Sequence, residues 1–384
     1  MSVAATVAPA ASAAAQELIR VMVVDDAIVV RGLISRWVEA EPGLALVASA
    51  RTGRDAVRDL LRADPDVVVL DIDMPDLDGL SALPLLLEKK RDLVVIMAST
   101  LSRRNAEVSL KALALGAADY ISKPATNREV TTSTTFRAEL IEKIRQLGGR
   151  HKRPQALARA SSAPAGADAR ARVIPAEPRL DIKLRPFSTA PARVLLIGAS
   201  TGGPQALTGL IKQLGPAIDR VPVLITQHMP ATFTTILAEH LARVSGRTTR
   251  EALDGEPITA GTIYIAPGGR HMLVARRNGA PTIALDDGPQ VNFCRPSVDP
   301  LFSSAAQVYG STSLAVVLTG MGSDGTRGAQ AVAAAGGSVI AQDEATSVVW
   351  GMPGSVAHAG VCSAVLPIGE IASKVASLFG GDRP

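Results

Sequence analysis

Short apolar runs alternate with amphipathic stretches from residue 19 to residue 147. The apolar runs are rich in valine, leucine and isoleucine, which is typical of buried strands; they are Arg20–Val24, Ala45–Ala50, Val67–Leu70, Leu93–Ala98 and Asp119–Ile121. The stretches that follow them have apolar residues at helical spacing; they are Ile28–Glu39, Arg54–Ala63, Gly79–Lys89, Asn105–Leu115 and Thr135–Leu147. This alternation predicts a first domain over residues 18–147, built on a parallel, doubly wound sheet with its site at the carboxyl ends of the strands.

The alternation stops between residues 148 and 192. An Ala/Ser/Pro/Gly tract is interspersed there with basic residues, beginning with Arg150, Lys152 and Arg153. The segment has too little periodic apolar surface to form a core, so we interpret it as a flexible basic linker. Contact with an acidic surface or with nucleic acid is the alternative role for its charges, and a solubilising connector is the interpretation we favour.

A second alternating region covers residues 193–380. Its first apolar run, Arg193–Ile197, ends in a glycine-rich turn, and a helix is expected from Pro204 to Leu214. Further apolar runs begin at Val221 and at Leu314. We expect a second, mostly parallel, doubly wound α/β domain.

Composition agrees with two aliphatic α/β domains. The chain has 384 residues, of which 47% are apolar and only 3% aromatic. No apolar run reaches the ~20 residues of a membrane span, so membrane insertion is not expected. Residues 1–17 are rich in alanine and lack the basic start of a signal peptide, which indicates a disordered leader on a cytoplasmic protein. Neither Cys294 nor Cys362 has a partner at metal-ligand spacing, so both are expected to be free thiols.

Polar residues that suit phosphoryl chemistry fall at the ends of strands in the first domain. Asp25 and Asp26 end the first strand, Asp71 the third, Ser99 the fourth and Lys123 the fifth. Three carboxylates that meet at one edge repel one another unless a hard cation such as Mg²⁺ lies between them. Acidic residues also end strands and cap helices for structural reasons. Their coincidence with a hydroxyl and a lysine favours a phosphoryl acceptor.

The same motifs resemble a response-regulator receiver domain, which has a flavodoxin-like fold. The resemblance rests on Val-Val-Asp25-Asp26, Leu70-Asp71-Ile-Asp-Met-Pro75 with Asp78-Gly79, Ser99-Thr100 and Lys123-Pro124. It implies that Asp71 is the phosphoacceptor, that Mg²⁺ is bound by Asp25, Asp26 and Asp71, and that a histidine kinase is the phosphodonor. It also implies that Lys123 contacts the phosphoryl group and that Ser99 and Tyr120 change position on activation.

The turn Gly198-Ala-Ser-Thr-Gly-Gly203 in the second domain matches the G-x-S-x-G pattern of a nucleophile elbow. A serine there would lie beside the free amides at the start of a helix, which suit a developing oxyanion. Taken alone, such a turn more often closes a loop or binds phosphate. Whether Ser200 is a nucleophile therefore depends on a base and an acid elsewhere in the chain.

Two further strand ends supply those groups. His228 follows the run that begins at Val221, and Asp324 follows the run Leu314–Thr319. The carboxyl ends of parallel strands meet at one rim, so the three side chains satisfy the requirements of a Ser–His–Asp triad. The structural alternatives are a turn cap for Ser200, a buried histidine for His228 and a helix cap for Asp324. The loop residue His271 could line the same site.

The second domain resembles the catalytic domain of the CheB family of protein-glutamate methylesterases. The resemblance rests on the Ser200 turn, Gln227-His-Met-Pro230, Ala266-Pro-Gly-Gly-Arg-His271, Arg295-Pro-Ser-Val-Asp-Pro-Leu-Phe302, Gly320-Met-Gly-Ser-Asp-Gly325 and Ser347-Val-Val-Trp-Gly-Met-Pro353. It implies Ser200, His228 and Asp324 as the triad and the Met321 amide as an oxyanion donor.

The resemblance also implies an activity. It is the hydrolysis of glutamate γ-methyl esters on methyl-accepting chemotaxis receptors, with deamidation of glutamines, as part of chemotaxis adaptation. No cofactor is expected for ester hydrolysis, because a nucleophile, a proton shuttle and an oxyanion site suffice. We expect the unphosphorylated receiver to cover the Ser200 rim.

Two other functions are compatible with a receiver domain at the start of the chain. One is a transcriptional regulator with a DNA-binding output domain, but nothing after Arg193 resembles a helix-turn-helix, so no nucleic-acid partner is expected. The other is a scaffold whose output domain has lost catalysis. The presence of all three triad residues argues against it.

Overall fold

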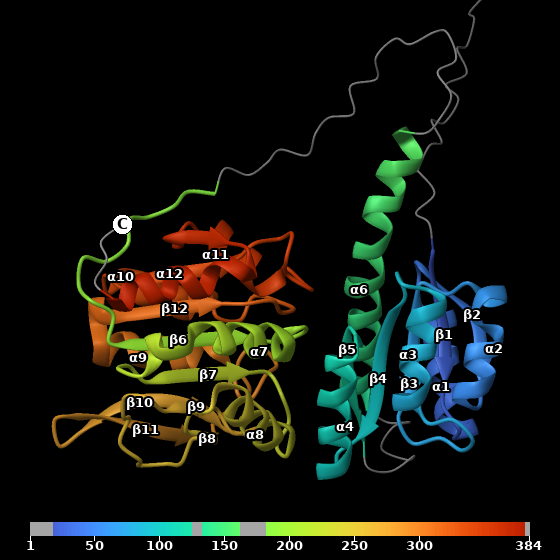
Figure 1. The fold of residues 1–384 in the computed structure, drawn as a ribbon, viewed down its shortest axis with the longest axis horizontal. Coiled ribbons are helices and arrows are strands. Elements are labelled where there is room, and N and C mark those ends of the chain that lie inside the picture. The colour runs from blue at the N-terminus through green and yellow to red at the C-terminus, as the bar shows by residue number, and fades with distance from the viewer. Residues whose placement is uncertain (1–17, 125–132, 162–181, 381–384) are drawn as a thin grey trace, which may run out of the picture.

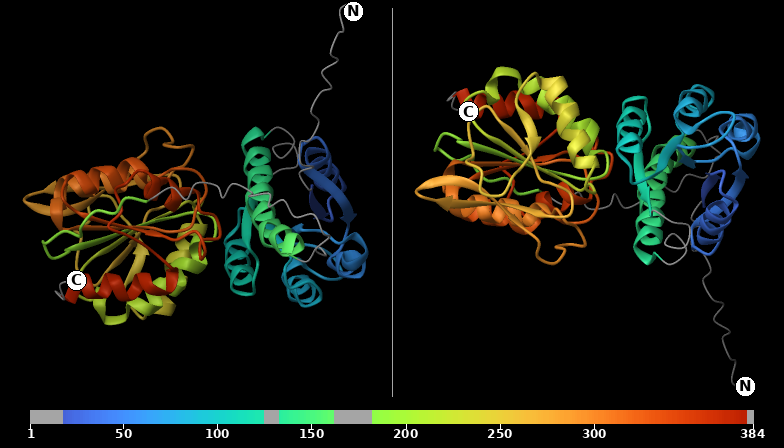
Figure 2. Two further views of the ribbon diagram at one scale, coloured as in Figure 1. Left: turned by 90° about the horizontal axis from the view of Figure 1, so that it is seen from above. Right: turned by 90° about the horizontal axis from the view of Figure 1, so that it is seen from below.

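A computed structural model of the chain describes residues 18–124, 133–161 and 182–380 (Figure 1). The predicted leader, residues 1–17, lies outside the described residues, and so do residues 162–181 of the predicted linker. Two α/β domains lie side by side in all three views (Figures 1 and 2). Both form the doubly wound architecture that the alternation of runs predicts.

The first domain is a five-stranded parallel sheet with strand order β2-β1-β3-β4-β5. Its strands are β1 (Ile19–Val24), β2 (Leu44–Ala50), β3 (Val67–Asp71), β4 (Val94–Thr100) and β5 (Asp119–Lys123). Its helices are α1 (Ile28–Glu39), α2 (Gly53–Ala63), α3 (Gly79–Lys89), α4 (Arg103–Ala114) and α6 (Thr134–Ser161). This order is the flavodoxin-like one, which confirms the fold expected from the sequence.

Alternate residues of each strand pack against helices on opposite faces of this sheet. In β1, Val21 and Val23 belong to a buried cluster with α1 and α6, whereas Met22 and Val24 belong to one with α2, α3 and α4. The strands are therefore buried on both sides, which explains why they are apolar runs rather than alternating ones.

Helix α6 is longer than the sequence pattern predicts. We expected its end at Leu147, before Gly148 and Gly149, but the helix continues to Ser161. The residues after the glycines include alanine, arginine, leucine and glutamine, which are good helix formers. Neither α6 nor any other helix in the described ranges is long and apolar enough to cross a membrane.

The second domain contains a seven-stranded sheet of order β14-β13-β12-β6-β7-β9-β8, in which every neighbouring pair is parallel. Its strands are β6 (Val194–Ala199), β7 (Val223–Gln227), β8 (Thr249–Glu251), β9 (Ile263–Ile265), β12 (Ser313–Val317), β13 (Ser338–Gln342) and β14 (Ala364–Leu366). The strand order reverses at β6, whose neighbours are β7 and β12. The carboxyl ends of these strands form the switch point where open α/β sheets bind ligands.

Helices cover both faces of this second sheet. One face packs against α7 (Gly203–Leu214), α8 (Phe233–Ser245) and α12 (Ile368–Gly380). The other packs against α9 (Val298–Tyr309), α10 (Thr326–Ala334), α11 (Gly351–His358) and the antiparallel hairpin of β10 (His271–Arg277) and β11 (Ala280–Asp286). Two short 3₁₀ helices, Gly215–Ile218 and Gly310–Thr312, complete the domain.

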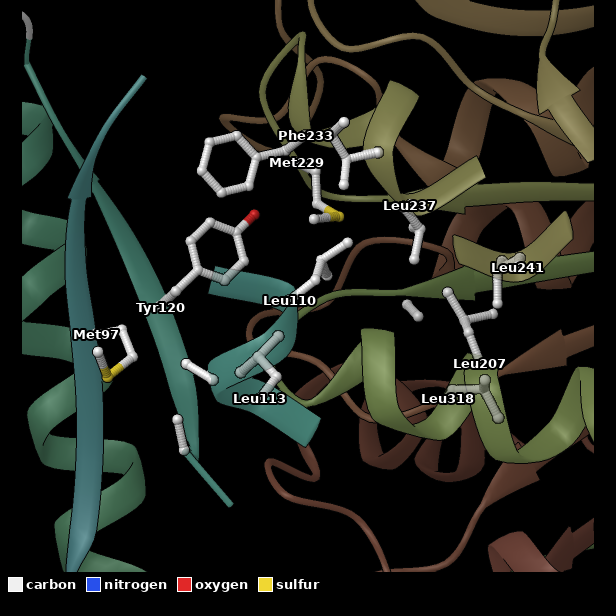
Figure 3. Close-up of a cluster of buried hydrophobic side chains, with 14 of the residues drawn as sticks. Met97, Leu110, Leu113, Tyr120, Leu207, Met229, Phe233, Leu237, Leu241 and Leu318 are labelled. Carbon is white, nitrogen blue, oxygen red and sulfur yellow. The ribbon is translucent and has the colours of Figure 1, made fainter. Parts of the chain in front are cut away.

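The two domains meet where α4 and β5 of the first pack against α7 and α8 of the second (Figure 3). The ring of Tyr120 stacks on that of Phe233, with centroids 4.8 Å apart and planes 9° from parallel. Leu110 and Leu113 of α4 share a buried cluster with Leu207 of α7. The interface therefore has an apolar centre.

Polar contacts and rim loops extend this interface. Gln205 Nε2 donates to the Ala117 carbonyl at 3.1 Å, and Arg103 Nη2 donates to both carboxylate oxygens of Glu239 at 2.8 and 2.9 Å. Met321 and Val349, in the loops after β12 and β13, pack with the buried cluster of the first domain. The first domain thus contacts segments that border the carboxyl rim of the second sheet.

Candidate active site

The predicted phosphorylation site is a buried ion-pair cluster at the carboxyl edge of the first sheet. Lys123 Nζ donates to Asp71 Oδ1 at 2.6 Å and to Asp25 Oδ2 at 3.2 Å. Burial raises the pKa of Asp71 to about 6, with Lys123 opposing the rise and Asp25 adding to it. Burial likewise raises the pKa of Asp25. The cluster holds more negative charge than one lysine balances.

These carboxylates fit a divalent cation. Asp25, Asp26 and Asp71 each offer an oxygen, and the three oxygens lie within 4.8 Å of one another. Asp26 is exposed, whereas the other two are buried, so the cluster is open on one side. Hard oxygen donors of this kind suit Mg²⁺.

The two predicted switch residues contact groups other than Asp71. The Ser99 hydroxyl is 3.2 Å from that of Ser109 in α4, and no hydrogen bond in the described part of the chain joins Ser99 to Asp71. Tyr120 is buried against Phe233 of the second domain. Both side chains therefore contact α4 or the domain interface in this structure.

Ser200 lies directly after β6, in a turn that requires glycine at position 202. Gly202 has φ +74°, and a Cβ there would lie 2.5 Å from the Val348 Cβ. The Ser200 amide donates to the Thr319 carbonyl at 3.0 Å, and its carbonyl accepts from Gln227 Nε2 at 2.9 Å. The turn is thus fixed to the ends of β7 and β12 on either side, and the Ser200 side chain is only partly buried.

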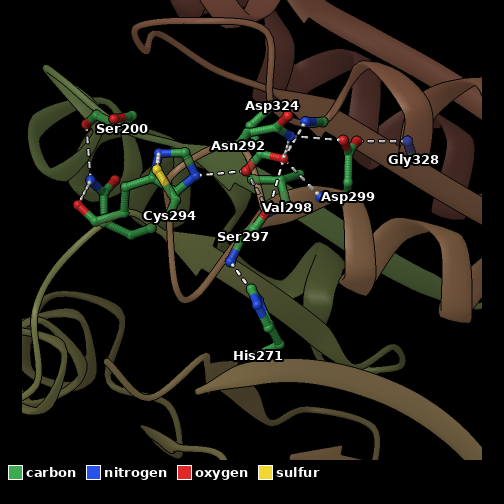
Figure 4. Close-up of polar contacts among 12 residues, drawn as sticks. Ser200, His271, Asn292, Cys294, Ser297, Val298, Asp299, Asp324 and Gly328 are labelled. Atoms are coloured by element: carbon green, nitrogen blue, oxygen red, sulfur yellow. Dashed lines mark hydrogen bonds and ion pairs between the residues drawn. The ribbon is translucent and has the colours of Figure 1, made fainter. Parts of the chain in front are cut away.

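His228 and Asp324 meet at the same rim. His228 Nε2 is 2.7 Å from Asp324 Oδ2. The Asp324 carboxylate also accepts from the amides of Val298 and Asp299, at 2.6 and 3.1 Å, and from the Ser297 hydroxyl at 2.7 Å (Figure 4). Asp324 therefore lies at the N-terminus of α9, where free amides favour a negative charge. Asp324 is the N-cap residue of neither helix, since Gly325 caps α10 and Ser297 caps α9, but it binds the first amides of α9 as well as the histidine.

These contacts set the charges of the pair. Burial raises the pKa of Asp324, but its hydrogen bond with His228 and those with the α9 amides hold the pKa well below its usual range. Burial lowers the pKa of His228, but its hydrogen bonds to Asp324 and Cys294 outweigh that effect and raise the pKa to about 10. The contacts of this pair therefore favour the imidazolium form of the ring over the neutral form. The contribution of this ion pair to the free energy of unfolding is complete below about pH 6.5 and is lost as the pH rises through about 10.

The loop before α9 adds two residues that the sequence reasoning missed. Asn292 Nδ2 donates to Asp324 Oδ1 at 2.9 Å, and Cys294 Sγ lies 3.4 Å from His228 Nδ1. Both cysteines are free, as expected. His271 supports this loop, since its ring contacts the Ser297 amide and the Pro289 carbonyl. The only sequence feature that pointed to this loop was the motif Arg295-Pro-Ser-Val-Asp299, and the motif alone does not indicate what Asn292 or Cys294 contacts.

Ser200 lies at this rim without a bond to the histidine. Within the described residues no hydrogen bond joins the Ser200 hydroxyl to His228, whose free ring nitrogen faces Cys294 instead. The backbone before Met321 does approach the serine, because a Cβ on Gly320 would lie 2.8 Å from the Ser200 Cβ. The structure thus pairs His228 with Asp324 and brings the Gly320–Met321 backbone to Ser200.

Known proteins resemble this chain over its whole length. Its residues 195–375 match the family model of the CheB methylesterase, and residues 21–135 match that of the response regulator receiver domain. A relative from Rhodopseudomonas palustris, named protein-glutamate methylesterase/protein-glutamine glutaminase of group 2 operon, is 61% identical over 391 residues that span both chains completely. The chain belongs to the CheB methylesterase family.

Two further relatives resemble the chain in whole or in part. One from Nitrobacter hamburgensis, named protein-glutamate methylesterase/protein-glutamine glutaminase, is 62% identical over 368 residues, which is 96% of each chain. The crystal structure of the Thermotoga maritima CheB methylesterase catalytic domain is 43% identical, and the match covers 49% of this chain and 100% of that one with a TM-score of 0.47. Because of the two family-model matches, the domains are called the receiver and the catalytic domain below.

The charge of His228 can be tested directly. An NMR titration of the full chain is expected to give this ring a pKa near 10. In Asp324→Asn the pKa should fall, because burial is then opposed only by the contact with Cys294. Cys294→Ala should also lower the pKa. His240, which lies on α8 and whose pKa burial lowers, should not move in either variant. A wild-type His228 that titrates near 6.5 would contradict this description of the pair.

Proposed function

We propose that Ser200, His228 and Asp324 hydrolyse glutamate γ-methyl esters on methyl-accepting chemotaxis receptors and deamidate glutamines by the same route. Membership of the family makes the chain a protein-glutamate methylesterase and protein-glutamine glutaminase of chemotaxis adaptation, controlled by its receiver. The observation that carries the proposed triad is the 2.7 Å contact between His228 and Asp324 at the rim beside the Ser200 turn.

The contact of Nε2 with Asp324 supports His228 Nδ1 as the proposed basic nitrogen. Asp324 binds Nε2 and so fixes the tautomer of the neutral ring, in which Nε2 carries the proton. Nδ1 is then free to accept, provided that the Ser200 hydroxyl replaces Cys294 beside it. In the charged ring both nitrogens are donors, so only the neutral form can take the serine proton.

The reaction then follows the ordinary course of acyl transfer. Ser200 Oγ forms a bond to the ester carbonyl carbon while its proton moves to His228 Nδ1. The tetrahedral intermediate breaks its bond to the methoxy oxygen, which takes the proton from His228 and leaves as methanol. Water, activated by the same nitrogen, then cleaves the acyl-enzyme and yields the glutamate carboxylate. With a glutamine substrate the leaving group is ammonia.

Backbone amides beside Ser200 would stabilise the oxyanion. The close approach of Gly320 to Ser200 supports the Met321 amide as one donor. The start of α7, two to three residues beyond the serine, adds the positive end of a helix dipole. These groups need no metal, so ester hydrolysis is proposed to proceed without a cofactor.

In the receiver, Asp71 is proposed to accept a phosphoryl group from a chemotaxis histidine kinase. Asp25, Asp26 and Asp71 would hold Mg²⁺, which when bound supplies positive charge to this acidic cluster. Lys123, already in contact with Asp71, would bind the phosphoryl oxygens. Neither nucleic acid nor a membrane insertion has a role in the proposal, and the protein is proposed to act in the cytoplasm.

Phosphorylation is proposed to weaken the docking of the receiver on the catalytic rim. The docked receiver contacts Gln205 and Phe233, which lie five residues beyond Ser200 and His228 respectively. Ser99 and Tyr120 connect the phosphorylation edge with α4 and with this interface. A phosphoryl group that drew Ser99 toward Asp71 would shift α4 and Tyr120 and favour the undocked state.

Replacement of the nucleophile tests the reaction. Ser200→Ala should lose essentially all methanol release from a methylated receptor, because triad members act as a unit. The variant should still accept a phosphoryl group at Asp71, which serves as the control for folding. Methanol release within about tenfold of wild type would mean that another residue is the nucleophile.

Charge reversal tests the docking. Arg103→Glu places like charges at the interface and should raise basal methanol release without phosphodonor about fivefold, the effect of roughly 1 kcal/mol on the docked state. Combining it with Glu239→Arg restores an ion pair and should return the basal rate to that of wild type. Arg62→Glu, on an exposed face of α2, is the control and should change nothing. A basal rate unaffected by Arg103→Glu would contradict the docking proposal.

A further inference from the structure

A strained turn beside the triad projects an aromatic ring into solvent. Val291 and Cys294 form a pair of backbone hydrogen bonds of 3.1 and 3.0 Å that close a two-residue turn. Its central residues, Asn292 and Phe293, have φ of +52° and +62°. Turns of this kind favour glycine or asparagine at both positions, so a phenylalanine there is an outlier. The Phe293 side chain is 94% exposed, so no part of the described chain covers it.

The catalytic residues themselves hold this turn. Asn292 Nδ2 donates to Asp324 Oδ1 and, at 3.0 Å, to Asp299 Oδ2. Cys294 Sγ contacts His228 Nδ1 at 3.4 Å. The residues on both sides of Phe293 therefore bind the histidine and the aspartate of the triad (Figure 4). A strained backbone persists only where its surroundings fix it, and such strain concentrates at functional sites.

Folding does not account for Phe293. A buried ring would stabilise the fold, but an exposed one in a left-handed conformation does not, and glycine would fit the turn better. The docked receiver also leaves the ring uncovered. Phe293 directly precedes Cys294, whose Sγ contacts His228, so the exposed ring belongs to a loop that borders the site.

We propose that Phe293 is a substrate-docking residue, whose ring packs against apolar side chains of the receptor beside the reacting glutamate or glutamine. This proposal rests on the proposed function. Aromatic residues, phenylalanine included, are enriched at protein interfaces, and a rigid backbone reduces the entropy lost on binding. The ring would supply affinity for a protein substrate and none for a small ester that occupies only the triad.

The test measures the kinetics of the full chain on two substrates, methylated receptor and p-nitrophenyl acetate, in the presence of phosphodonor. For Phe293→Ala, KM for methylated receptor should rise roughly tenfold with kcat within about twofold of wild type. kcat/KM for p-nitrophenyl acetate should be unchanged, because this ester is too small to reach the ring. Phe293→Tyr, which keeps the aromatic ring, should restore the receptor KM. The control is Leu184→Ala, which removes another exposed apolar side chain, 56% exposed, and should alter neither substrate.

Three other outcomes would contradict the docking role of Phe293 or the proposed function. An unchanged receptor KM in Phe293→Ala would overturn the proposal. Equal losses with both substrates would overturn it too, because they would show that the ring supports the triad rather than the receptor. If the wild-type chain hydrolysed the small ester but released no methanol from methylated receptor, the proposed function itself would fail, and that result does not depend on Phe293.

Discussion

The catalytic rim depends on the buried carboxylate of Asp324. A charge that is 2% exposed is costly unless several donors satisfy it. The donors here come from separate parts of the chain: His228 after β7, Asn292 and Ser297 in the loop before α9, and the first amides of α9. One carboxylate therefore holds the proposed catalytic base, a helix and the Phe293 turn in a fixed arrangement. Removing it would free the histidine and leave the other donors unsatisfied.

The receiver contains the opposite arrangement. There two buried carboxylates share one lysine, so the cluster is short of positive charge rather than satisfied. A site of this kind responds to an added cation and phosphoryl group, whereas the Asp324 network is already complete. The interface between the domains combines a stacked aromatic pair with an exposed ion pair, and such contacts are individually weak. A small change in the receiver can therefore shift the docked population without disturbing the triad.

The sequence predicts what is local and periodic. It places α1 and α3 at their observed bounds and puts Ser200, His228 and Asp324 at the ends of β6, β7 and β12, because strands and turns have short-range signatures. It does not reveal the contact of Cys294 with His228 or the stacking of Tyr120 on Phe233, since these join residues more than sixty positions apart. The end of α6 was predicted too early, because the glycine pair that indicated a stop did not interrupt the helix.

The central claim is that the receiver controls access to the rim while the triad stays assembled. Methanol release from methylated receptor, measured with and without a small phosphodonor in wild type and in Asp71→Ala, tests it most directly. The wild-type rate should rise with the phosphodonor, whereas Asp71→Ala should keep the basal rate and show no rise. A full response in Asp71→Ala would contradict the account, because control would then not pass through this carboxylate.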